Sequence, residues 1–294
     1  MAISNEKIEK ISQVVIKVLY SRFQNFPKDS TENRNAPFHE AFLNAFNQSI
    51  SNSIISDIPY LISINSWIHG LSTSLGMTYF EQVAHILCEG EKREYTSGRG
   101  TFGNLRLSQI QKSTISSIIT DLSNGVKNPS LQIENDLIFQ NNENLSTNAD
   151  DFTADVFYET ENDIIAIELK AVHPNGGEIK GEKTKILQGK AALHNIFPNK
   201  NIKFNIGFPY DPLSEGNTTY DKNRFMRSII NMGKYFTDDE VLLSEELWHM
   251  LSGEENTMQQ LLDNINSIAT SEFEQRFDFL ANLENRNSNR ELYI

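Results

Sequence analysis

The ten residues DIIAIELKAV, numbers 163–172, form an apolar run with two charged residues near its end. They are mostly apolar and rich in isoleucine, so the segment is predicted to be a buried strand. Glu168 and Lys170 interrupt its apolar pattern. Because side chains alternate along a strand, these two charged groups project from the same face. The sequence around them has to explain why a buried strand carries both.

A second predicted strand, DFTADVFYET (151–160), comes just before the first. The polar sequence END lies at their junction, so the two segments are expected to form a hairpin. The hairpin brings Asp155 alongside Glu168. A lone Glu-x-Lys pair is more often the solvated face of an edge strand. The second carboxylate, and the lysine-rich segment that follows, favour a site made of two carboxylates and one ammonium.

The remaining elements are predicted from apolar periodicity. Strands are expected at 202–210 and at EVLL (240–243), and helices at 6–24, 38–56, 60–70, 108–123 and 181–197, around FEQVAHIL, and along the C-terminal tail. This order predicts an α/β (α+β) fold in which a small mixed sheet is flanked by helices. We expect a single elaborated domain, with a helical arm (1–70), a catalytic core (71–245) and a helical C-terminal segment (246–294).

Composition excludes several classes of protein. Cys88 is the only cysteine, which excludes an internal disulfide and a multi-cysteine zinc site. No apolar run approaches the roughly 20 residues of a membrane helix, and the N-terminus lacks an apolar signal core, so a cytoplasmic protein is expected. The sequence GRGTFG (98–103) matches a dinucleotide-binding pattern, but the polar CEGEKREYTS precedes it in place of a buried strand. No organic cofactor is therefore expected.

The net charge of −13 hides a segregated distribution. Residues 128–169 contain no lysine or arginine, whereas 170–203 contain seven lysines against Glu178 and Glu182. A single charged block is usually a solvated helix face. This one begins at the predicted carboxylate and lysine cluster, where phosphodiester hydrolysis fits the chemistry. Two carboxylates bind Mg²⁺, and the lysine orients water or neutralises charge on the phosphate.

Asp155, followed after a gap by Glu168-Leu169-Lys170, resembles the PD-(D/E)XK nuclease motif, and the order of elements resembles the restriction-endonuclease-like core of that superfamily. The resemblance implies that Asp155, Glu168 and the Leu169 carbonyl hold Mg²⁺ and that Lys170 is the catalytic lysine. It also nominates Glu81, on SLGMTYFEQVAHIL, although a surface glutamate is an equal alternative. The chain departs from the family pattern at Ala154, where proline is usual.

A longer stretch, including IELKAVHPNGGEIKGEKTKILQGKAAL and ELWHMLSGE, resembles the TdeIII group of type II restriction endonucleases. The resemblance to that group implies cleavage of double-stranded DNA at the interrupted palindrome GGNCC. A palindromic site is matched by a two-fold homodimer. The terminal helical segments, with Trp67 and Trp248, would supply either the dimer interface or core. A repair or junction-resolving nuclease of the same fold and a non-cleaving DNA-binding protein are the alternatives.

Basic residues near this motif are expected to contact DNA. Lysines fix the register of a protein on the phosphates, and arginines favour guanine readout. For each arginine, including Arg224 and Arg227, a solvated surface position is the alternative. The residues predicted to bind DNA are Lys180, Lys183, Lys185, Lys190, Arg93, Arg99 and Arg106.

Overall fold

The computed structural model describes residues 2–23, 25–27, 36–46, 58–96, 102–140, 142–170, 176–270 and 273. The chain divides into two compact units. Met1–Lys7 and Glu81–Leu262 form what we call the sheet unit, and Ile8–Phe80 and Asp263–Ile294 form the helical unit. Among the described helices, none combines the length and apolarity needed to cross a membrane.

The sheet unit is built on a mixed sheet, five-stranded over the described ranges, in the order β1-β4-β5-β6-β7. The predicted hairpin is confirmed, since β4 and β5 are antiparallel neighbours, while β6 and β7 extend the sheet in parallel. A separate two-stranded sheet pairs β2 with β3. The strands are β1 (Glu91–Tyr95), β2 (Arg106–Leu107), β3 (Thr147–Asn148), β4 (Phe152–Glu159), β5 (Asp163–Leu169), β6 (Asn201–Phe208) and β7 (Val241–Leu243).

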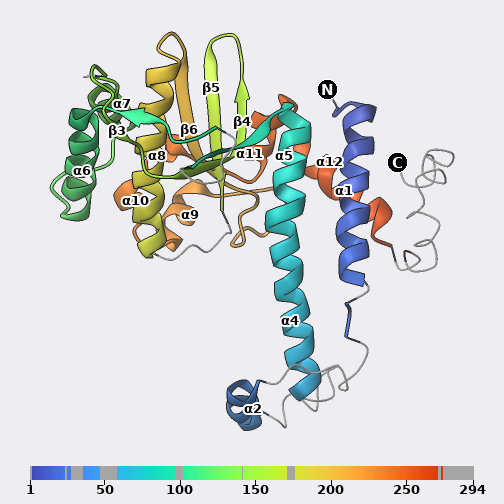
Figure 1. Cartoon of the computed structure of the whole chain (residues 1–294). Coiled ribbons are helices and arrows are strands. Elements are labelled where there is room, and N and C mark those ends of the chain that lie inside the picture. Colours follow the sequence, from blue (N-terminus) through green and yellow to red (C-terminus); the bar gives the residue numbers. More distant parts are fainter. Residues whose placement is uncertain are drawn as a thin grey trace. The chain divides into compact units, whose positions relative to one another are not determined.

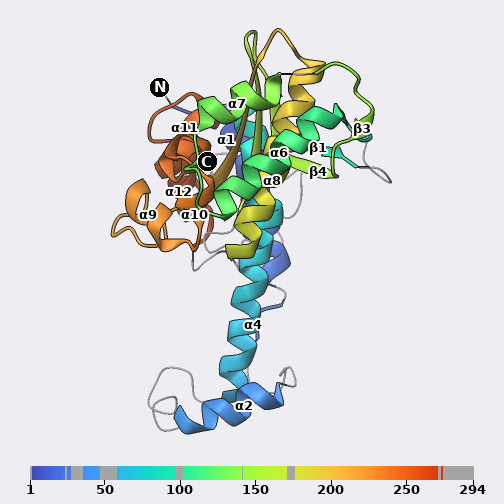
Figure 2. The same cartoon turned by 90° about the vertical axis from the view of Figure 1, so that its left-hand side faces the viewer.

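Helices cover both faces of this sheet (Figure 1). On one face lies α8, with α6 and α7 packed beside it, as Figure 2 shows from the side. On the other face lie α5 and α11, and a side chain added at Gly207 of β6 would meet Leu247 of α11. The bounds are α5 (Glu81–Cys88), α6 (Gln109–Ser123), α7 (Leu131–Phe139), α8 (Gly176–Ile196), α9 (Lys222–Ser228), α10 (Met232–Tyr235), η4 (Asp238–Glu240), α11 (Glu245–Ser252) and α12 (Thr257–Ile268).

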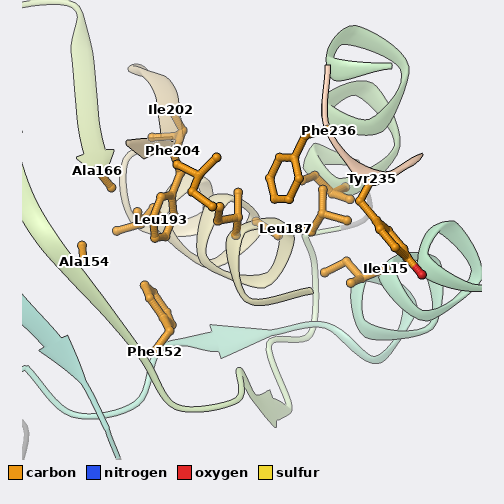
Figure 3. Packing of buried hydrophobic residues seen from close by; sticks show 14 of the residues in the cluster. Ile115, Phe152, Ala154, Ala166, Leu187, Leu193, Ile202, Phe204, Tyr235 and Phe236 are labelled. Carbon is orange, nitrogen blue, oxygen red and sulfur yellow. The ribbon is translucent and has the colours of Figure 1, made fainter. Parts of the chain in front are cut away.

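The main core lies between the sheet and α8 (Figure 3). Phe204 of β6 and Phe152 of β4 face Leu193 of α8 across this layer. The helix approaches so closely that a Cβ at Gly189 would lie 2.6 Å from the Phe204 ring. Glycine at this position therefore lets α8 pack directly against the strands, which fixes the height of the helix over the sheet.

The helical unit contains α1 (Asn5–Phe23) from Ile8 onward, α2 (Pro37–Leu43), the short turn η2 (Asn44–Phe46), α4 (Ile58–Ser74) and the π-helical segment η3 (Leu75–Phe80). Reciprocal hydrogen bonds join α1 to α4. Trp67 Nε1 donates to the Arg22 carbonyl oxygen at 2.8 Å, and Arg22 donates to the Trp67 carbonyl oxygen at 3.0 Å. Residue 47 onward in the predicted helix 38–56 lies outside the described residues, as do 274–294 of the predicted C-terminal segment.

Several local features differ from the predictions. The polar segment after Cys88 contains strand β1 where a loop was expected, and α7 was not predicted. The glycine-rich approach to the lysine-rich helix is itself helical, because α8 begins at Gly176. Strand β5 ends at Leu169, and 171–175, which include the last residues of the quoted stretch, lie outside the described residues.

Candidate active site

Asp155 and Glu168 face each other across the hairpin. Val156 pairs with Ile167, so the next step of the antiparallel ladder sets Asp155 opposite Glu168. The Leu169 backbone N–H donates to Asp155 Oδ2 at 3.0 Å, which fixes that carboxylate. His85 Nε2 lies 2.6 Å from the Asp155 carbonyl oxygen. Because a carbonyl only accepts, this nitrogen carries the proton.

Glu168 is buried, with 5% of its surface exposed. Its two oxygens contact different lysines: Oε1 lies 3.0 Å from Lys170 Nζ, and Oε2 lies 2.6 Å from Lys185 Nζ. Burial raises the pKa of Glu168, and the nearby Asp155 raises it further, while the two lysines oppose them. Two carboxylates this close repel each other, and a cation between them would relieve that repulsion.

Glu182 of α8 contacts the same two lysines. Its Oε1 lies 2.7 Å from Lys170 Nζ, and its Oε2 lies 3.5 Å from Lys185 Nζ. Glu168, Lys170, Glu182 and Lys185 therefore form a closed ring of alternating charge, which we call the charge ring. Burial opposes the charged form of Lys170, but Glu168 and Glu182 outweigh it and raise the pKa of Lys170. The lysine is thus held as an ammonium.

A third lysine links Asp155 to Glu81. Lys92 of β1 lies 2.9 Å from Glu81 Oε2 and 3.5 Å from Asp155 Oδ1. Burial opposes its charged form, but the two carboxylates outweigh burial and raise the pKa of Lys92. One ammonium thus bridges both acids, which brings Glu81 to the same site as the hairpin carboxylates.

The side chains of this site fit a hard divalent cation. Over the described ranges, no three or more His, Cys, Asp or Glu side chains are arranged around a common metal position. Mg²⁺ needs only one or two protein carboxylates, because waters and substrate phosphate complete its shell, and Asp155 with Glu168 supplies two.

A groove of about 460 Å³ opens beside the charge ring. Lys185 lines it and also contacts Glu168, so one lysine belongs to both the groove and the charge ring. Its other lining residues are Asp150, Asp151, Lys180, Gly181, Thr184 and Gln188. Gln188 Nε2 donates to Asp150 Oδ2 at 2.7 Å, which holds one wall in place.

Lys183 and Lys190, predicted to bind DNA, are buried instead. Lys183 is 0% exposed and lies 2.6 Å from Glu134 and 2.7 Å from Glu240, while Lys190 is 2% exposed and lies 3.5 Å from Glu240. A buried ammonium cannot reach a phosphate. We therefore assign both lysines a structural role in place of the predicted phosphate contact. Lys180 is exposed, and Lys185 is partly exposed beside the groove.

The arginines have separate surroundings. Arg93 stacks on Phe157, 3.7 Å from the ring centroid, and binds Glu91 at 2.7 Å. Arg106 is exposed on β2, and Arg99 lies outside the described residues. Arg224 is paired with Asp211 at 2.7 Å. Trp248, weighed as an interface residue or as core, is core, since it is 2% exposed and donates to the Pro209 carbonyl oxygen.

Sequence reasoning missed Lys92, His85 and Glu182 as neighbours of the carboxylates, and it treated Lys185 as a phosphate contact alone. Lys92 lies in the segment read as a loop, so no strand alternation pointed to it. Glu182 and Lys185 are three positions apart on one helix, a spacing that places them on the same face. That spacing was the available signal for the charge ring.

Two comparisons with known proteins bear on this site. The family model described as "Type II restriction endonuclease, HinfI" matches residues 3–269. This chain belongs to the HinfI family of type II restriction endonucleases. A relative, the type II restriction enzyme MjaII of Methanocaldococcus jannaschii, is 46% identical over 284 residues, which cover 95% of this chain and 75% of the relative.

Membership in the HinfI family makes the chain a site-specific deoxyribonuclease that acts on double-stranded DNA. The predicted class of enzyme is therefore confirmed, as is the mixed α/β fold with a sheet flanked by helices. The narrower resemblances, to the PD-(D/E)XK motif and to the TdeIII group with its GGNCC site, stay predictions.

Proposed function

We propose that this chain is a Mg²⁺-dependent, homodimeric type II restriction endonuclease that cuts both strands of a short palindrome, with GGNCC as the first sequence to test. The observation that carries the proposal is the pairing of Asp155 and Glu168 across the hairpin, with the Lys170 ammonium 3.0 Å from Glu168. This arrangement supports assignment to the PD-(D/E)XK superfamily. The choice of GGNCC rests on the resemblance to the TdeIII group.

In this proposal Asp155, Glu168 and the Leu169 carbonyl would hold Mg²⁺. When bound, the ion supplies Lewis-acid polarisation of the phosphate and lowers the pKa of a coordinated water. Leu169 contributes twice, since its N–H already fixes the Asp155 carboxylate. Glu81 takes part through Lys92, which contacts both acids. No organic cofactor is needed.

Lys170 stabilises charge on the phosphate in this mechanism. Its Nζ is held by Glu168 and Glu182, so in this proposal it donates hydrogen bonds to the phosphate as an ammonium. An ammonium held beside the carboxylates is already placed where negative charge develops. The position of Lys170 at the end of β5, where its N–H binds the Gly207 carbonyl oxygen at 2.9 Å, limits the movement of its backbone.

Lys180 and Lys185 are the proposed phosphate contacts, because they line the groove beside the charge ring. Arg93, Arg99 and Arg106 are retained as proposed DNA contacts. A two-fold homodimer matches a palindrome, because each subunit then meets one strand in the same way. Sedimentation of the protein alone and with duplex DNA tests this assembly.

Plasmid cleavage tests the proposed function. The purified protein is incubated with plasmid DNA with Mg²⁺ or with a chelator, beside the Lys170→Ala variant. We expect discrete fragments only from the unmodified protein with metal, and sequenced ends give the site. A GGNCC duplex is compared with one in which the guanines are changed. Random degradation favours a repair or junction-resolving nuclease, and bound but intact DNA favours a non-cleaving DNA-binding protein.

A further inference from the structure

The charge ring contains one acid that the proposed metal chemistry does not use. Glu182 lies on α8 and contacts Lys170 at 2.7 Å and Lys185 at 3.5 Å. A carboxylate at this position is unfavourable for DNA, because its charge repels the approaching phosphate. A group that opposes substrate binding, yet lies within the site, needs another reason to be there.

Lys170 has a long, flexible side chain that is not positioned by Glu168 alone. A lysine ammonium is a point charge on a four-carbon stem and has no fixed geometry. Metal binding at Glu168 would weaken the contact between Glu168 and Lys170, since the same carboxylate would then serve the cation. Glu182 offers a second contact that does not depend on Glu168, and this contact is the shorter of the two.

Glu182 is itself held in place by the helix that carries it. The next residue, Lys183, is fully buried and paired with Glu134 and Glu240, so this turn of α8 is anchored to the core. Lys185, on the same face as Glu182, contacts the second oxygen of Glu168 at 2.6 Å. The rigid helix therefore sets the position of both ring lysines relative to the β5 carboxylate.

We infer that Glu182 is a positioning residue for DNA cleavage, which holds the Lys170 ammonium in the site through a contact that does not depend on Glu168. The inference rests on the proposed function. Glu182 makes no contact with the reacting atoms and acts through Lys170. Its loss should therefore affect the chemical step, while DNA binding is unchanged or improved because a negative charge is removed.

Steady-state cleavage of a duplex at saturating Mg²⁺ tests this inference with three variants. Glu182→Gln keeps the size of the side chain and removes its charge, and Glu182→Asp keeps the charge on a shorter stem. Glu178→Gln is the matched control. Glu178 lies on the same helix, but its contact with Lys170 is longer, at 3.7 Å, and its side chain is more exposed than that of Glu182. We expect kcat to fall about 10-fold to 100-fold in Glu182→Gln, since a small misplacement of a reacting group has that effect.

The variants should also separate kcat from KM. For Glu182→Gln the KM for DNA should be no higher than in the unmodified protein, Glu182→Asp should retain more of kcat, and Glu178→Gln should stay within about twofold in kcat. Unchanged kcat in Glu182→Gln, or a loss confined to KM, overturns the inference. If Glu182→Gln does not fold, Glu182→Ala carries the same expectation.

Failure of the inference can be told from failure of the proposed function. If the unmodified protein cuts with metal and Lys170→Ala does not, the proposed site stands, whatever Glu182→Gln does. If Lys170→Ala cuts as well as the unmodified protein, the proposed role of Lys170 is wrong, and the inference about Glu182 falls with it.

Discussion

The ammonium of Lys183 lies 2.7 Å from Glu240 in a part of the core where neither side chain is more than 1% exposed. Glu134 completes the contact from α7, 2.6 Å from the same ammonium. These ion pairs join α8 to α7 and to η4. The helix that presents Glu182 and Lys185 is thus anchored by charge as well as by apolar packing.

Removing the Lys183 charge should destabilise the fold. In Lys183→Met the apolar volume is largely kept, but Glu134 and Glu240 lose the ammonium they share, and breaking a buried pair in this way costs about 3–5 kcal/mol. We expect a fall of that size in the free energy of unfolding, measured by urea denaturation.

Lys203→Met is the matched control for that measurement. Lys203 also pairs with an acid, at 3.1 Å from Asp163, but its side chain is 49% exposed. A surface pair is worth about 0–1 kcal/mol, so this variant should lose little. Equal losses in the two variants would contradict the proposed anchoring by buried charge.

The acid stability of the protein should depend on Glu240. Burial alone would raise the pKa of Glu240, but Lys183 and Lys190 outweigh it and hold that pKa below its ordinary value of 4.5. A carboxylate with a depressed folded-state pKa stabilises the fold above its unfolded-state pKa, and the stabilisation is lost as pH falls through the folded-state value. The difference in unfolding free energy between the unmodified protein and Lys183→Met should therefore shrink below about pH 4.5. A difference that stays constant across that range would argue against this linkage.

Cleavage and DNA binding should separate at Glu168. Glu168→Gln removes a proposed metal ligand, and we expect cleavage to fall by at least about 100-fold, the scale seen when one electrostatic contributor is removed. The same change removes a negative charge from the site, so the affinity for duplex DNA measured without divalent cation should be equal or higher. Cleavage assays and electrophoretic mobility shifts check the two effects. Loss of binding in parallel with cleavage would show that Glu168 acts elsewhere than in the chemical step.

The salt dependence of DNA binding should distinguish two lysines of one helix. Each phosphate contact that is lost lowers the slope of log affinity against log salt by about one. Lys185→Gln should lower that slope, because Lys185 lines the groove beside the carboxylates. In Lys183→Met the slope should be unchanged at a temperature where the variant is folded. Equal slopes for Lys185→Gln and the unmodified protein would exclude the proposed phosphate contact.

The hairpin was predictable because its signals are local. Strands β4 and β5 are β-rich and adjacent in the chain, so the predicted hairpin, together with alternation along each strand, placed Asp155 beside Glu168. The abundance of lysines in α8 did not show which of them are buried and which face the site. Lys183 and Lys190 are seven positions apart and share the buried face of α8, whereas Lys185 points to the site. The buried lysines form ion pairs with Glu134 and Glu240. Both acids are distant from α8 in the sequence, so no local pattern indicates these pairs.

Strand β1 was missed because its sequence, EKREY, looks like a solvated loop. It forms one edge of the sheet, with Glu91, Lys92, Arg93 and Glu94 in succession along it. Charged side chains on an edge strand hinder pairing with the strands of another chain, and so protect the protein against aggregation. The charged residues that made β1 look like a loop therefore also hinder pairing of this edge with a strand of another molecule. One of them, Lys92, in addition contacts Asp155.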